Sequence, residues 1–219
     1  MAQARKLHDH YFKQAKAEGY LARSAYKLKE IIQKRQLLKR GDRVLDLGCA
    51  PGSWLQVASE TIGDRGVVVG LDLQAVDTHL GANVKTLQGD VFKTEPAQLL
   101  ALSGKSTLFD VVLSDMAPNT TGDGDHFRSV ELCRRVLAIL PGLLKAGGKM
   151  TMKVFEGEEY PSLLKEVKLR FTEVKGFKPD ATRDVSKEMY IIGVGYKPPV
   201  RKSEASKQPP AVGEGTISQ

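Results

Sequence analysis

The chain has 219 residues and a mass of 24.0 kDa, enough for one well-buried α/β domain with a short extension. Hydrophobic residues make up 41% and charged residues 27%, as in ordinary globular proteins, and no window approaches the roughly 18 apolar residues of a membrane span. The N-terminus lacks the apolar segment of a secretory signal, and two cysteines are too few for a disulfide scaffold or a cysteine-rich zinc site. We therefore expect a cytoplasmic, monomeric protein without a bound metal.

The positive charge of the chain, +7 in total, is concentrated in residues 1–40. This segment, here called the arm, holds eleven Lys and Arg against three acids, whereas the remainder holds 22 against 23. Its aromatic residues are Tyr11, Phe12, Tyr20 and Tyr26. Cations interleaved with aromatic rings suit the phosphate backbone of a nucleic acid with exposed bases or sugars, although a solvated basic helix is the alternative. The apolar stripe of Leu28, Ile31 and Ile32 predicts that the arm is helical, with Ser24 as a cap.

After Gly41, apolar runs alternate with helical patterns, which is typical of a Rossmann-like α/β fold. We expect strands at 43–47, 67–72, 84–87, 109–115 and 149–155, and helices near 53–62, 95–102, 127–146 and 159–170. Two last runs, 172–176 and 188–196, have no helix between them and predict an antiparallel pair at one sheet edge. The pattern thus predicts a mostly parallel seven-stranded sheet with helices on both faces, over residues 41–197. From Pro198 to the end, four prolines and no aromatics predict disorder.

The most informative stretch is the apolar run Val44–Leu47 followed by a turn that contains Gly48 and Gly52. It predicts a buried strand that enters the turn before a helix, where ligands bind in open α/β sheets. The motif G-x-G-x-x-G of dinucleotide sites is absent, so an uncharged or cationic ligand fits better than a pyrophosphate. The motif alone leaves S-adenosylmethionine, another ligand, or none as alternatives.

Acidic residues follow three of the expected strands. Asp72 ends the second strand, where a carboxylate can accept hydrogen bonds from both hydroxyls of an adenosine ribose. Asp90 follows the third strand and either accepts a hydrogen bond from the adenine amine or simply forms a turn. Asp115 ends the fourth strand and should face the ligand cleft, with helix capping or a salt bridge as the alternative.

Lys153 lies in an apolar strand and should be buried. Burial favours the neutral amine, whereas a nearby carboxylate such as Asp115 favours the charged form, so this lysine is a candidate acid or base. A lysine whose amine reaches solvent at the strand end is the alternative. The segment after Ser114 also lacks the Asn-Pro-Pro-Tyr and Pro-Cys motifs of base methylases, which favours a hydroxyl or carboxyl acceptor.

Five separated segments occur in the order and at the distances found in the FtsJ/RrmJ family of ribose 2′-O-methyltransferases, which the chain resembles over about residues 10–197. The segments are Arg23–Leu28, Asp46–Trp54, Ser114–Asn119, Lys153–Phe155 and Ser186–Tyr190. Cys49 and Ser53 stand where the family commonly has Ala and Gly, and the tail after Pro198 is an addition.

The resemblance implies an S-adenosylmethionine-dependent methyltransferase that modifies the ribose 2′-hydroxyl of a uridine in 23S ribosomal RNA, with the large ribosomal subunit as partner. It implies four catalytic residues, with Lys153 as the proton acceptor: Lys27, Asp115, Lys153 and Glu188. It also implies the cofactor contacts Gly52, Trp54, Asp72, Asp90 and Asp115. The alternatives are a non-catalytic ribosome-assembly or RNA-binding factor, a methyltransferase of transfer RNA or messenger RNA caps, and an NAD-dependent oxidoreductase.

Overall fold

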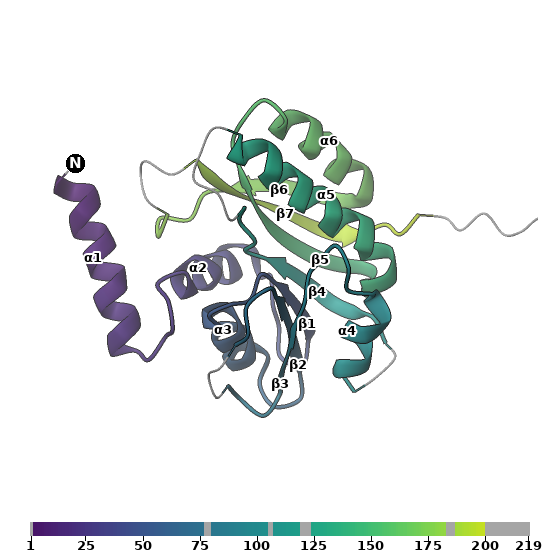
Figure 1. Cartoon of the computed structure of the whole chain (residues 1–219), viewed down its shortest axis with the longest axis horizontal. Helices are drawn as coiled ribbons and strands as arrows, with labels where there is room; N and C mark the ends of the chain where they lie inside the picture. Colours follow the sequence, from purple (N-terminus) through teal and green to yellow (C-terminus); the bar gives the residue numbers. More distant parts are fainter. Residues whose placement is uncertain (1, 77–79, 105–106, 119–123, 183–186, 200–219) are drawn as a thin grey trace, which may run out of the picture.

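A single twisted sheet forms the centre of the computed structural model, which describes residues 2–76, 80–104, 107–118, 124–182 and 187–199, with side chains from residue 10 onward (Figure 1). The strand order is β3-β2-β1-β4-β5-β7-β6. The strands are β1 (Arg43–Leu47), β2 (Val67–Asp72), β3 (Val84–Gln88), β4 (Phe109–Ser114), β5 (Leu144–Phe155), β6 (Phe171–Phe177) and β7 (Glu188–Tyr196). The helices are α1 (Ala2–Ala17), α2 (Ala25–Arg35), α3 (Ser53–Ile62), α4 (Pro96–Leu102), α5 (Asp125–Leu143) and α6 (Tyr160–Arg170).

The predicted fold class is confirmed. Strands β1 to β5 run parallel, and β7 pairs antiparallel with both β5 and β6. The buried strands β1, β2 and β4 are nearly continuous apolar runs, because helices cover both of their faces. Helices α2 and α3 cover one face, and α4, α5 and α6 cover the other (Figure 1).

One predicted boundary is wrong. The helix expected to reach residue 146 ends at Leu143, and β5 begins at once with Leu144 rather than at Lys149. Leu144 pairs with Phe109 of β4, and both side chains are buried. The burial of these two side chains favours an extended Leu144, and the glycines that follow, Gly147 and Gly148, are poor helix formers.

The second helix of the arm is part of the core. Leu28 and Ile31 of α2 have no exposed surface, and they pack with apolar residues of α3 and the sheet. The predicted helix is therefore confirmed, and Ser24 is at the predicted N-cap position, although its side chain makes no capping hydrogen bond. Its hydroxyl lies 2.8 Å from the hydroxyl of Ser53, which begins α3. This pair links the starts of the two helices.

The ends of the chain lie outside this layered core. Figure 1 shows α1 as an outlying helix next to α2, on the side away from α4. The predicted disorder of residues 198–219 concerns a segment that, except for Pro198 and Pro199, lies outside the described residues. Among the helices that the structure describes, none combines the length and apolarity that a membrane-spanning segment needs.

Replacing Leu28 with Ala tests the packing of α2. Because the side chain is completely buried, we expect the free energy of unfolding to fall by about 2–5 kcal/mol in urea titrations. The control is Leu169→Ala on α6, whose side chain is 77% exposed. A loss below about 0.5 kcal/mol for Leu28→Ala would show that α2 is not part of the core.

A buried acid interrupts the apolar core at β1. Asp46 has no exposed surface, and among the described residues neither of its carboxyl oxygens has a hydrogen-bond partner. Burial raises the pKa of Asp46 well above the usual value for aspartate, and the nearby charges of Asp115 and Asp72 raise it further. The folded chain therefore holds this proton more tightly than the unfolded chain.

Asp46→Asn tests this protonation. The stability that the raised pKa contributes is present below the ordinary aspartate pKa and is lost as pH rises toward the folded-state pKa. Asn carries no such proton, so the stability of Asp46→Asn relative to wild type should increase from about pH 5 to about pH 8. Urea unfolding followed by the fluorescence of Trp54, the single tryptophan, measures this difference. The exposed Asp64→Asn is the control, and a difference for Asp46→Asn that does not change with pH would contradict the assignment.

Candidate active site

A cleft of about 680 Å³ opens at the carboxyl ends of the parallel strands. It lies where the strand order reverses between β1 and β4, which is where ligands bind in open α/β sheets. Asp72, Asp90, Asp115 and Lys153 all line it, so the structure brings these four predicted site residues together.

The turn after β1 lies close to the end of β4. Gly48 has φ +80°, and a Cβ at this position would lie 2.6–2.9 Å from side-chain and backbone atoms of Met116. A larger residue would therefore push the two strand ends apart, and only glycine satisfies both the dihedral angle and the close approach. Gly52, with φ +118°, is the N-cap residue that precedes α3. The predicted need for glycine at both positions is thus explained.

Asp72 and Asp90 hold the turns that form one side of the cleft. The carboxylate of Asp72 accepts hydrogen bonds from the backbone N–H of Ala50 and of Gln74, both at 2.9 Å. Asp90 accepts one from the backbone N–H of Phe92 at 2.9 Å, which is the turn-forming alternative that the sequence left open. Each carboxylate oxygen has a further lone pair, so both residues can also accept from a ligand.

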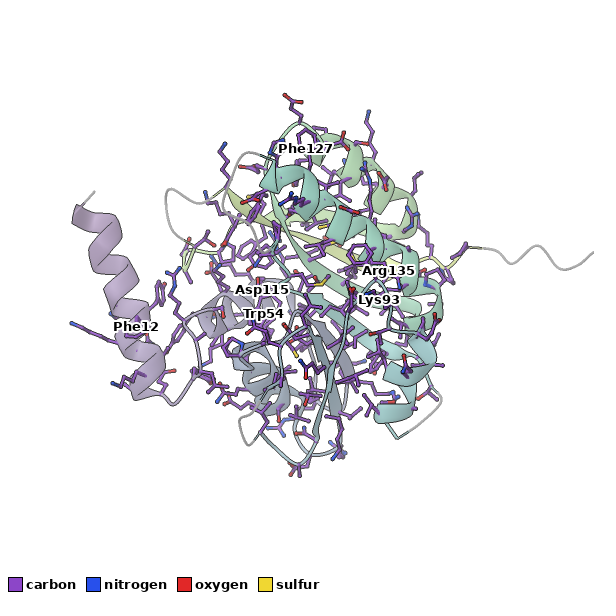
Figure 2. The ribbon with its side chains drawn as sticks, in the orientation of Figure 1. Phe12, Trp54, Lys93, Asp115, Phe127 and Arg135 are labelled. Carbon is purple, nitrogen blue, oxygen red and sulfur yellow. The ribbon has the colours of Figure 1, made fainter. Side chains whose placement is uncertain are left out.

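Lys153 and Asp115 form a pair that is largely shielded from water. The ammonium of Lys153 lies 3.1 Å from Oδ1 of Asp115 and donates to the backbone carbonyl of Asp115 at 2.6 Å. The two side chains are 8% and 18% exposed. The nitrogen is thus held inside the cleft, which excludes the solvent-reaching alternative. Figure 2 labels Asp115 at the end of β4.

A third side chain, that of Tyr190, is hydrogen-bonded to this pair. Its hydroxyl donates to Oδ1 of Asp115 at 2.7 Å, and the whole side chain is buried. Burial, followed by the negative charge of Asp115, raises the pKa of Tyr190 well above its usual value, so the phenol remains a donor. Tyr190 faces Lys153 directly in the β5–β7 register. The three side chains therefore fix one another.

A second ion pair connects the arm to the sheet. Lys27 of α2 donates to Glu188 of β7 at 2.5 Å, with side chains 7% and 22% exposed. The ammonium of Lys27 also lies 6.0 Å from the ring centroid of Tyr190. Tyr190 thus lies between the two ion pairs, and the four residues of the implied tetrad form one cluster.

Trp54 and Gly52 lie to one side of the cleft, and neither is among its described lining residues. The indole of Trp54 is 2% exposed, donates to the backbone carbonyl of Ser24 at 2.9 Å, and stacks on Tyr190 with ring centroids 5.8 Å apart. Its side chain therefore supports Tyr190 and α2. The predicted cofactor contacts at both positions stay predictions.

Sequence reasoning missed two contributions to the site. It gave Tyr190 no role, although the two-residue period of a strand places Tyr190 on the same face as Glu188. It also missed the cleft residues of α5, which are Arg128, Glu131 and Leu132. Their helical period does not reveal which strand end they face, so no local signal could have found them.

Comparison of the sequence with known proteins finds a matching family and relatives that share one name. The family model described as FtsJ-like methyltransferase matches residues 20–196. The ribosomal RNA large subunit methyltransferase E of Methanothrix thermoacetophila is 47% identical over 206 residues, which cover 92% of this chain and 78% of that protein. The enzyme of the same name from Syntrophobacter fumaroxidans is 49% identical over 190 residues, 86% of this chain and 95% of that protein.

Solved structures agree. A structure described as a ribosomal RNA methyltransferase from Plasmodium falciparum superposes with a TM-score of 0.70 at 29% identity, over 81% of this chain and 98% of that chain. Fibrillarin from Aeropyrum pernix, solved with bound S-adenosylmethionine, superposes with a TM-score of 0.56 at 22% identity, over 78% of this chain and 76% of that chain, and shares the fold. By its matched residues and these identities, the chain belongs to the FtsJ-like methyltransferase family.

Proposed function

We propose that this chain transfers a methyl group from S-adenosylmethionine to the ribose 2′-hydroxyl of a uridine in 23S ribosomal RNA of the large ribosomal subunit. The observation that carries the proposal is the buried Lys153–Asp115 pair at the cleft of an FtsJ-like methyltransferase. We infer that the chain acts as a monomer in the cytoplasm, where this substrate is made.

The cleft suits S-adenosylmethionine. Its volume of about 680 Å³ is within the range of roughly 300–1,000 Å³ for small-molecule sites. Asp72, Asp90 and Asp115 give it three carboxylates, which favour a ligand with cationic groups over a pyrophosphate. Apolar side chains, among them Val91 and Leu132, provide walls for a flat base. We assign the ribose to Asp72 and the adenine amine to Asp90, with Gly52 and Trp54 as further contacts.

S-adenosylmethionine supplies a methyl group on a sulfonium, an electrophile that is already reactive. The task of the protein is to align the acceptor oxygen and to remove its proton. Orientation can contribute roughly 7–11 kcal/mol to lowering the barrier, and a general base about 10²–10⁴-fold in rate.

We assign the general base to Lys153. Its neutral amine accepts the 2′-hydroxyl proton at Nζ, which the structure holds inside the cleft beside Asp115. Asp115, held by Tyr190, keeps Nζ in place. After the transfer, Asp115 pairs with the ammonium that has formed.

We assign Lys27 to the phosphate or sugar of the target nucleotide. Glu188 holds its ammonium at 2.5 Å and therefore orients this lysine rather than Lys153. The pair couples the arm to the reaction site, because α2 carries Lys27 and packs in the core.

We assign RNA binding by the arm to helix α1. This helix lies outside the core in Figure 1, and Phe12 on it is 60% exposed. Lys13 and Lys16 are exposed on the same helix. Residues 1–40 cannot be removed together as a test, since that deletion would take buried side chains of α2 with it.

Substitution of Lys153 tests the role of the general base. Lys153→Ala should lose about 10²–10⁴-fold in methyl transfer while its affinity for S-adenosylmethionine stays within a few-fold of wild type. Lys153→Arg keeps a cation for Asp115 but cannot give up its proton, so it should be equally inactive. Labelled methyl transfer to unmethylated large subunits and equilibrium cofactor binding measure the two quantities. The control is Lys175→Ala on β6, and near wild-type transfer by Lys153→Arg would refute the assignment.

The salt dependence of RNA binding tests α1. Each phosphate contact with single-stranded RNA contributes about 0.7 to the slope of log affinity against log salt. The double variant Lys13→Ala/Lys16→Ala should therefore flatten the slope by about 1.4, measured by filter binding to a 23S ribosomal RNA transcript. The control is Lys165→Ala/Lys168→Ala on α6, whose lysines are also exposed. A slope for Lys13→Ala/Lys16→Ala that is the same as that of wild type would exclude these two lysines of α1 from the interface.

A further inference from the structure

A second hollow, of about 700 Å³, lies beside the start of α5. Its described lining residues, none of which lines the cleft, are Gly124, Asp125, His126, Phe127, Phe155, Glu156 and Lys187. The implied catalytic and cofactor residues do not include any of them. We call it the α5 hollow.

The α5 hollow is built on the two strands that carry the catalytic cluster. Phe155 follows Lys153 by two residues along β5, which places their Cα atoms about 7 Å apart. Lys187 directly precedes Glu188, and its carbonyl accepts a hydrogen bond from the backbone N–H of Glu156 at 2.9 Å. The hollow therefore lies within reach of a nucleotide next to a target ribose placed at Lys153.

Aromatic rings dominate one wall. Phe127 is 49% exposed although it is apolar, and its ring centroid lies 4.1 Å from that of His126. His126 packs against Gly157, where a Cβ would lie 2.6–2.9 Å from its side-chain atoms. The close approach at Gly157 fixes His126, which in turn supports Phe127. An exposed ring with a supported position offers a face on which a base can stack.

The charges inside the hollow favour a base over a phosphate as its ligand. Asp125 and Glu156 would repel a phosphate inside it, whereas their oxygens can accept hydrogen bonds from the amino group of a base. Lys187 is exposed and can contact the phosphate of the same nucleotide. The hollow thus offers an aromatic face and hydrogen-bond acceptors for a base, and a neighbouring cation for a phosphate. These are the groups that the binding of one nucleotide requires.

We propose that the α5 hollow binds a nucleobase that flanks the target nucleotide of the RNA, stacked on Phe127, with its phosphate at Lys187. This inference rests on the proposed function and adds a position at which the substrate is recognised beyond the reacting ribose. It also explains why a large apolar side chain at the start of α5 is left exposed next to the active site.

Phe127→Ala tests the stacking. Loss of one base–aromatic contact should weaken the affinity for protein-free, unmethylated 23S ribosomal RNA by about 5- to 150-fold, and Phe127→Tyr should restore it. With large subunits as substrate, KM should rise while kcat and the affinity for S-adenosylmethionine stay as in wild type. The matched control is Leu169→Ala, an apolar residue 77% exposed on α6.

The outcomes separate this inference from the proposed function. If Phe127→Ala binds protein-free RNA as the control does, the hollow does not bind a base. A defect seen only on assembled subunits would instead indicate a ribosomal protein as the partner and would overturn the inference. Wild-type protein that transfers no labelled methyl to large subunits overturns the proposed function, whatever Phe127→Ala does.

Discussion

The site depends on keeping an amine and a carboxylate together where little water reaches them. Lys153 and Asp115 come from neighbouring strands, so the parallel register of β4 and β5 brings them to the same edge of the sheet. Because water is largely excluded from this pair, removal of either partner would leave the other charge without compensation. Such an unpaired charge destabilises the folded state. Tyr190 reduces this cost because its phenol supplies a hydrogen bond that does not depend on charge. The geometry of the base is thus set by packing.

The same packing connects stability with function. Lys27 and Glu188 are 161 positions apart in sequence, and they meet because α2 packs against α3 and the sheet. Trp54 bridges these parts, since its indole donates to the residue before α2 and stacks on Tyr190. A substitution that loosens α2 should therefore disturb the active site as well as the core. The arm accordingly consists of two parts, a core helix that carries Lys27 and an outlying helix to which we assign RNA binding.

The strands, the sheet class and the cleft could be predicted from the sequence because their signals are local. The apolar run before Gly48 marks β1, and the acids Asp72 and Asp115 mark strand ends that meet at one edge. The pairing of Lys27 with Glu188 could not be read from spacing and came from the family resemblance, because it depends on how α2 packs. The end of α5 was misplaced for a related reason, since the burial of Leu144 against β4 is a tertiary effect.

The central claim is that the neutral amine of Lys153 accepts the proton of the ribose hydroxyl. The most direct measurement is the rate of single-turnover methyl transfer at saturating RNA and S-adenosylmethionine, from about pH 6 to about pH 10. The account predicts that the rate increases with pH, because only the neutral amine can accept the proton. A rate independent of pH over this range would contradict it.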